Sequence, residues 1–176
     1  IRGQKVLDYF PNGIDNEAPE YSEIVTQTST MSLNEMVEGY KLSWFLITWH
    51  TGGFSQYIAR FLRKYKNVSY SDFYTGFRNY LQFNDFWRTN ENRMTDTIKD
   101  WYVNGKEIIS ELGPVTVTAS TNQYRTLFDI HLNTSYEIMY DLVNEYLKLF
   151  ELDEEIYKDL IRLNKCVVAK HEYLNN

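Results

Sequence analysis

Apolar side chains recur every three or four residues along most of this chain, and this spacing restricts the fold more than any other feature. The clearest stripe follows Gly52-Gly53 and consists of Phe54, Tyr57, Ile58, Phe61, Leu62 and Tyr65. On a helix, such spacing gathers the side chains on one face, which must be buried against another element. The sequence therefore predicts a mainly α fold, an irregular bundle of about six helices.

Helix starts and stops divide the chain into these elements. Ser32 and Glu35 have the spacing of a capping box, so a first helix is expected from about 33 to 51. Ser71 and Asp72 are expected to start the third helix, and the irregular segment 82–92 is expected to be a loop or a broken helix. The remaining helices are expected over 54–66, around 73–81, over 94–112, from 134 to about 151, and from 153 through Val167 towards Tyr173.

Two segments lack the helical period. Residues 1–30 contain Pro11, Gly13 and Pro19 and are expected to form an extended arm, or a linker from an upstream domain, ahead of a single helical domain over 31–176. The β-branched and alternating segment 115–132 is expected to be a short β-hairpin, or an extended strand that joins a sheet elsewhere. Because the chain begins at Ile1 rather than Met, we expect it to be a piece of a longer polypeptide.

Composition narrows the classes of function. Aromatic residues make up 16% of the chain, and packing in a core is their expected use, ahead of a ligand cage. The net charge of −6 argues against a nucleic-acid binder, and the basic run Arg60–Lys66 is expected to be a solvated helix face. No uncharged apolar stretch is long enough to span a membrane. The single Cys166 is expected to be a small buried residue, which favours a reducing, cytoplasmic setting.

The segment Trp49-His50-Thr51-Gly52-Gly53 is the sharpest candidate site. A histidine beside two glycines at a helix break can meet a ligand, because glycine allows a close approach of the backbone. The plainer alternative is a helix connection whose histidine interacts with the helix dipole. Trp49, His50, Gly53 and the nearby Gln56 are therefore candidate substrate-binding residues.

Asp129 and His131 form a second candidate pair. On a strand, residues two apart share a face, so this carboxylate could orient this imidazole as a base or help to bind substrate. The alternative is a surface pair on an extended segment. No zinc, thiolate or calcium spacing occurs in the sequence, and we assign neither a catalytic residue nor a metal ligand.

Several of these motifs together resemble a known family. They are Tyr9-Phe10-Pro11-Asn12-Gly13, Pro19-Glu20-Tyr21, Ser32-Leu33-Asn34-Glu35-Met36, the aromatic helix leading to His50 and Gly53, and Phe128-Asp129-Ile130-His131. In this respect the chain resembles the region that follows the barrel in cobalamin-binding radical SAM enzymes of the magnesium-protoporphyrin IX monomethyl ester oxidative cyclase type. The family's Cys-x3-Cys-x2-Cys motif and a glycine-rich cobalamin-binding half are missing from the sequence.

The resemblance implies a C-terminal accessory domain that shapes substrate access or docks a partner and has no catalytic residues of its own. Its partner would be the upstream barrel of the same polypeptide. That part would hold the 4Fe-4S cluster, S-adenosylmethionine and cobalamin of the oxidoreductase. Two alternatives remain open: a free-standing helical module that binds a ligand or a protein in an aromatic groove, and a small hydrolase that uses His131 and Asp129.

Overall fold

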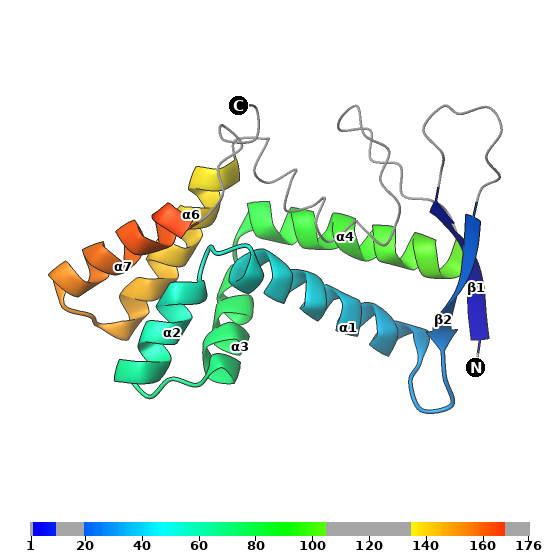
Figure 1. The fold of residues 1–176 in the computed structure, drawn as a ribbon, viewed down its shortest axis with the longest axis horizontal. Helices are drawn as coiled ribbons and strands as arrows, with labels where there is room; N and C mark the ends of the chain where they lie inside the picture. The colour runs from blue at the N-terminus through cyan, green and yellow to red at the C-terminus, as the bar shows by residue number, and fades with distance from the viewer. Residues whose placement is uncertain (1, 10–19, 105–134, 168–176) are drawn as a thin grey trace. The chain divides into compact units, whose positions relative to one another are not determined.

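The computed structural model describes residues 2–9, 20–104 and 135–167, and this part of the chain is mainly helical, as predicted (Figure 1). Six α-helices are described, which agrees with the expected number. They are α1 (Leu33–Leu46), α2 (Gln56–Tyr65), α3 (Tyr70–Leu81), α4 (Asp85–Asn104), α6 (Ser135–Leu147) and α7 (Glu154–Val167). A π-helical turn, Ile47–Thr51, extends α1, and a 3-10 turn, Lys148–Phe150, extends α6.

The chain divides into two compact units. Unit 1 comprises Ile1–Trp44 and Thr89–Arg125, and unit 2 comprises Phe45–Arg88 and Thr126–Asn176. The division at residue 30 that the sequence suggested is a different one, and it stays a prediction. The candidate site around His50 belongs to unit 2.

The N-terminal arm is extended, as predicted, but it also pairs with itself. Strands β1 (Arg2–Tyr9) and β2 (Glu20–Gln27) form an antiparallel two-stranded sheet in which Lys5 lies opposite Glu23. In the sequence, turn-forming residues such as Pro11 and Gly13 fall between the two strands, a signal that favours a hairpin. The N-terminal hairpin was not predicted, and the hairpin that was predicted, over 115–132, lies outside the described residues.

Aromatic side chains form the core of unit 2, as their number predicted. The ring of Trp49 lies 4.6 Å from that of Phe77 and 5.2 Å from that of Trp87, measured between centroids. Phe77 in turn stacks on Tyr146 at 4.9 Å. The three ring systems of Trp49, Phe77 and Trp87 are almost completely buried. Helices α3 and α6, the start of α4 and the π-helical turn therefore share one aromatic core.

The capping predictions were partly right. Ser32 and Glu35 form the predicted box, since the Ser32 amide donates to Glu35 Oε2 at 2.7 Å and the Glu35 amide donates to Ser32 Oγ at 3.4 Å. The cap of α3 is Ser69 and not Ser71, because Ser69 Oγ accepts the hydrogen of the Asp72 amide at 3.0 Å. Asp72 does lie in the first turn, as expected for a negative residue near a helix start.

Of the two alternatives predicted for 82–92, the loop is wrong and the broken helix is closer, because α3 ends at Leu81 and α4 already begins at Asp85. Asn84 caps this start, with its Oδ1 accepting the hydrogen of the Trp87 amide at 3.0 Å. The buried positions of α4 in this region are Trp87, Glu91, Met94 and Ile98, a helical spacing. The carboxylate of Glu91 interrupts the apolar pattern, so the sequence pattern did not predict the first turns of the helix.

Cys166 was also predicted wrongly, because it is exposed. On α7 the buried positions include Leu160 and Asn164, whereas Leu163 is 46% exposed. The sequence predicts a stripe that includes Ile156, Leu160 and Leu163, but Ile156 and Leu163 are exposed, so the buried face is rotated away from this stripe. The buried side chain of Asn164 is stabilised by a hydrogen bond that its Nδ2 donates to the main-chain oxygen of Phe54.

Candidate functional site: a histidine on a π-helical turn

The π-helical turn places His50 at the surface of unit 2. The Gly52 amide donates to Ile47 O at 2.7 Å, a bond across five residues, and the Gly53 amide donates to His50 O at 3.1 Å. Gly53 has φ of 89°, a left-handed conformation that a residue with a side chain rarely adopts. As a result Thr48 and Trp49 point into the core while His50 stays half-buried. Isolated π-helical turns are frequent at functional sites.

A chain of hydrogen bonds fixes the imidazole. Ser55 Oγ donates its only hydrogen to Trp49 O at 2.9 Å, and Ser55 Oγ also lies 3.3 Å from the hydroxyl of Tyr74. The Tyr74 hydroxyl lies 2.7 Å from His50 Nδ1. If each hydrogen is used once, Tyr74 donates to Ser55, and His50 Nδ1–H donates to Tyr74. This arrangement leaves the lone pair of Nε2 as the hydrogen-bond acceptor of His50.

The surroundings favour a neutral imidazole. Burial, together with the nearby charge of Arg60, lowers the pKa of His50 below its ordinary value. Burial raises the pKa of Tyr74, so its phenol keeps its hydrogen at neutral pH. The site therefore offers one oriented hydrogen-bond acceptor, Nε2. Ser55 is fully buried and donates to a carbonyl, so this serine is not placed to act as a nucleophile.

Aromatic and basic side chains surround His50. The ring of Tyr70 lies 5.8 Å from the imidazole, and the guanidinium of Arg63 lies 4.8 Å from the centre of the Tyr70 ring. Arg60 lies 5.5 Å from the ring centre of Tyr57. These residues come from α2 and α3, the two helices that follow the π-helical turn in the sequence.

The predicted site residues differ in their burial, and two of them are not described by the structure. Trp49 is fully buried in the aromatic core, where its indole N–H has no hydrogen-bond partner among the described residues. Gly53 is buried and shapes the turn, and Gln56 is the half-buried first residue of α2. Asp129 and His131 lie outside the described residues.

Sequence reasoning missed the partners of His50, namely Ser55, Tyr70, Tyr74, Arg60 and Arg63. One local signal was available, since Tyr70 and Tyr74 are four residues apart and share a face of α3. The contact of this face with His50 joins residues 24 apart. A local pattern does not specify such a contact.

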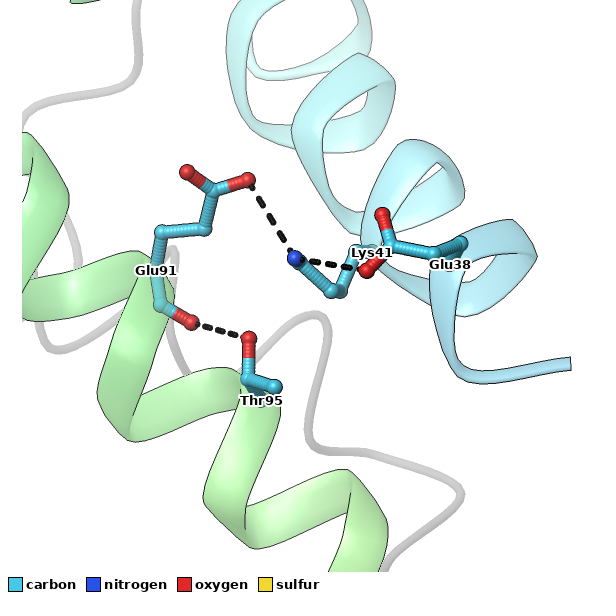
Figure 2. Close-up of polar contacts among 4 residues, drawn as sticks. All are labelled: Glu38, Lys41, Glu91 and Thr95. Carbon is cyan, nitrogen blue, oxygen red and sulfur yellow. Dashed lines mark hydrogen bonds and ion pairs between the residues drawn. The ribbon is translucent and has the colours of Figure 1, made fainter. Parts of the chain in front are cut away.

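A second polar cluster lies in unit 1 (Figure 2). Lys41 Nζ on α1 lies 2.9 Å from Glu38 Oε1 and 3.8 Å from Glu91 Oε1 on α4, and Glu91 is only 7% exposed. Thr95 Oγ1 donates to Glu91 O at 2.7 Å. Lys41 thus supplies the opposite charge that a buried carboxylate needs, and we assign the cluster to the packing of α1 on α4.

Within the described ranges, no group of three or more His, Cys, Asp or Glu side chains could hold a metal ion. A search of the same helices finds none with the length and apolar character that a bilayer crossing requires. A scan against protein-family models and a search of curated proteins return no match to this chain.

Proposed function

We propose that this chain is the C-terminal accessory region of a cytoplasmic, cobalamin-binding radical SAM enzyme similar to the magnesium-protoporphyrin IX monomethyl ester cyclases. In this proposal the chain binds and orients substrate, and the upstream barrel performs the chemistry. The oriented, half-buried His50 at the Gly52-Gly53 break is the observation that carries it. The motif that contains His50 is also one of those on which the family resemblance rests.

His50 is suited to binding rather than to nucleophilic chemistry. Its Nδ1 is engaged by Tyr74, so Nε2 can accept a hydrogen bond in a fixed direction, from a substrate hydroxyl or amide or from a water molecule bound to the magnesium ion of a metalloporphyrin substrate. Following the family resemblance, the proposal assigns the 4Fe-4S cluster, S-adenosylmethionine and cobalamin to the upstream part.

The alternative, a free-standing helical binding module, would use the same His50. The large aromatic side chains of unit 2 are mostly engaged with one another in the core. A binding role would therefore depend on the polar residues around His50 more than on an aromatic groove.

The test begins with the gene upstream of Ile1. We expect a Cys-x3-Cys-x2-Cys motif in the same reading frame. In the reconstituted full-length enzyme, with magnesium-protoporphyrin IX monomethyl ester as the probe, His50→Gln should raise KM by about tenfold, as expected for loss of a binding hydrogen bond. Cleavage of S-adenosylmethionine without substrate should stay unchanged.

Tyr74→Phe is the companion variant, because it keeps the imidazole and removes the group that orients it. It should raise KM by a smaller factor than His50→Gln. Exposed Arg162→Gln on α7 serves as the control and should behave as the wild type. Absence of the cysteine motif upstream, or an equal loss of S-adenosylmethionine cleavage in the His50 variant, would contradict the proposal.

A further inference from the structure

The charges of unit 2 are strongly segregated along the chain. Between Phe45 and Asn84 the only carboxylate is Asp72, although the whole chain has a net charge of −6. The cations of this segment are Arg60, Arg63, Lys64, Lys66 and Arg78. The acidic balance of the chain therefore conceals a basic region beside His50.

Part of this region forms one stripe on α2. Gln56, Arg60 and Arg63 have the i, i+4, i+7 spacing that aligns side chains along a helix face. The stripe lies beside His50, because Arg63 contacts the ring of Tyr70 and this ring contacts the imidazole. We call Gln56, Arg60, Arg63 and Tyr70 the arginine face.

Tyrosine rings, and not carboxylates, position the two guanidinium groups. Arg60 is placed by Tyr57 and Arg63 by Tyr70. Both arginines are exposed, and in the part of the chain that the structure describes neither forms an ion pair with a carboxylate. A guanidinium that stacks on a ring keeps its N–H groups free to bind an oxyanion through two parallel hydrogen bonds. The face is thus rich in donors and already partly ordered.

We infer that the arginine face, which adjoins the His50 site, binds the phosphate or diphosphate group of a small ligand. This inference rests on the proposed binding role of the His50 site and adds a second class of ligand, because magnesium-protoporphyrin IX monomethyl ester has no phosphate group. Two neighbouring arginines provide the bidentate donors that a phosphate prefers, and the Gln56 amide adds a further donor.

A small ligand fits this face better than a long polyanion. Helix α7 packs against α2, and its exposed side includes Glu154, Glu155 and Asp159. These carboxylates would repel an extended nucleic acid, whereas a compact phosphate group interacts mainly with charges within about 10 Å. The surface that favours an anion is therefore limited to the arginine face and its immediate surroundings.

Isothermal titration of the 176-residue chain with inorganic pyrophosphate tests the inference. We expect saturable binding of one pyrophosphate per chain. The double variant Arg60→Gln/Arg63→Gln should lower the affinity by about tenfold or more, since each substitution removes charge-assisted hydrogen bonds. The matched control, Arg88→Gln/Arg162→Gln, removes the same charge from exposed positions of unit 2 and should change the affinity by less than about twofold.

A third variant, Arg60→Lys/Arg63→Lys, separates geometry from charge. Lysine keeps the charge but lacks the planar fork, so its affinity should fall between those of the wild type and the Gln variant. Lack of saturable binding, or an equal loss in the control, would overturn the inference. If pyrophosphate fails to bind while His50→Gln still raises KM in the full-length enzyme, only the inference fails and the proposed function stands.

Discussion

Gly76 on α3 occupies a position where even a methyl group has no room. A Cβ built at this residue would overlap the phenolic oxygen of Tyr146. Gly39 on α1 provides a natural comparison, because nothing lies within 4 Å of the Cβ built there. Both glycines lie inside helices, so Gly76→Ala and Gly39→Ala make the same chemical change in opposite surroundings.

The expected effects follow from the contacts of Tyr146. Replacing an interior helical glycine by alanine should stabilise the fold by about 1 kcal/mol, and this is the whole effect expected at Gly39. At Gly76 the Tyr146 ring cannot simply move aside, because it stacks on Phe77 at 4.9 Å and its hydroxyl donates to Phe73 O at 3.3 Å. Loss of this hydrogen bond costs about 1 kcal/mol, and overpacking costs about 1–3 kcal/mol. The net result should be destabilisation by about 1–3 kcal/mol.

Urea unfolding followed by circular dichroism measures both effects, and the melting temperature should shift by about 2–4 °C per kcal/mol. The double variant Gly76→Ala/Tyr146→Phe tests the mechanism, because it removes the oxygen that the new methyl group meets. It should be more stable than Gly76→Ala alone. A Gly76→Ala protein as stable as the wild type would refute the steric reasoning, and so would equal destabilisation by Gly39→Ala.

Two other perturbations test the buried polar groups of unit 2. Asn164→Leu should destabilise the protein by about 1–3 kcal/mol in urea unfolding, because it removes the buried Nδ2 that donates to Phe54 O, whereas Asn79→Leu on the exposed side of α3 should have a much smaller effect. For His50, the lowered pKa means that below the ordinary value of 6.5 the folded protein binds fewer protons than the unfolded chain. Its contribution to stability should be complete above pH 6.5 and should be lost as the pH falls through the folded-state pKa. In urea unfolding between pH 7.5 and 5, the stability advantage of the wild type over His50→Gln should therefore shrink.

Contrary results would be informative in both cases. An Asn164→Leu protein with wild-type stability would mean that the apolar gain of leucine offsets the lost hydrogen bond. If the difference between the wild type and His50→Gln is constant over this pH range, or grows as the pH falls, burial and Arg60 do not oppose protonation of His50 in the folded protein.

Local patterns were sufficient to predict most of the helical fold. The Ser32–Glu35 box, the stripe of α2 and the Gly52-Gly53 break each depend on residues within a few positions of one another. Asp153 is a further example, since its Oδ1 accepts the hydrogen of the Glu155 amide at 3.0 Å at the start of α7. Such features arise from short-range hydrogen bonding and side-chain spacing, so they can be read without knowledge of the tertiary structure.

The candidate site was only half predictable, because part of it depends on contacts between residues that are distant in the sequence. His50 and Gln56 stood out because they adjoin a glycine break. Tyr74 and Ser55 were missed because they become neighbours of His50 only once α3 packs beside the π-helical turn. The hydrogen-bond chain is a product of tertiary structure, and a stripe of tyrosines in the sequence is equally typical of a core.

The two wrong helix predictions have one physical cause. The rule that apolar residues face inward fails wherever a buried position holds a polar side chain with a distant partner. Glu91 is such a residue, since Lys41 on another helix faces it, and Asn164 is another, since it bonds to Phe54 O. Because Glu91 is polar, the apolar pattern did not predict the start of α4. Because Asn164 is polar, the pattern predicted the wrong buried face of α7, the one that contains Cys166. Buried polar residues thus mark the points where the fold depends on contacts that are remote in sequence, and Ser55, whose Oγ lies 3.3 Å from the Tyr74 hydroxyl, belongs to the same class.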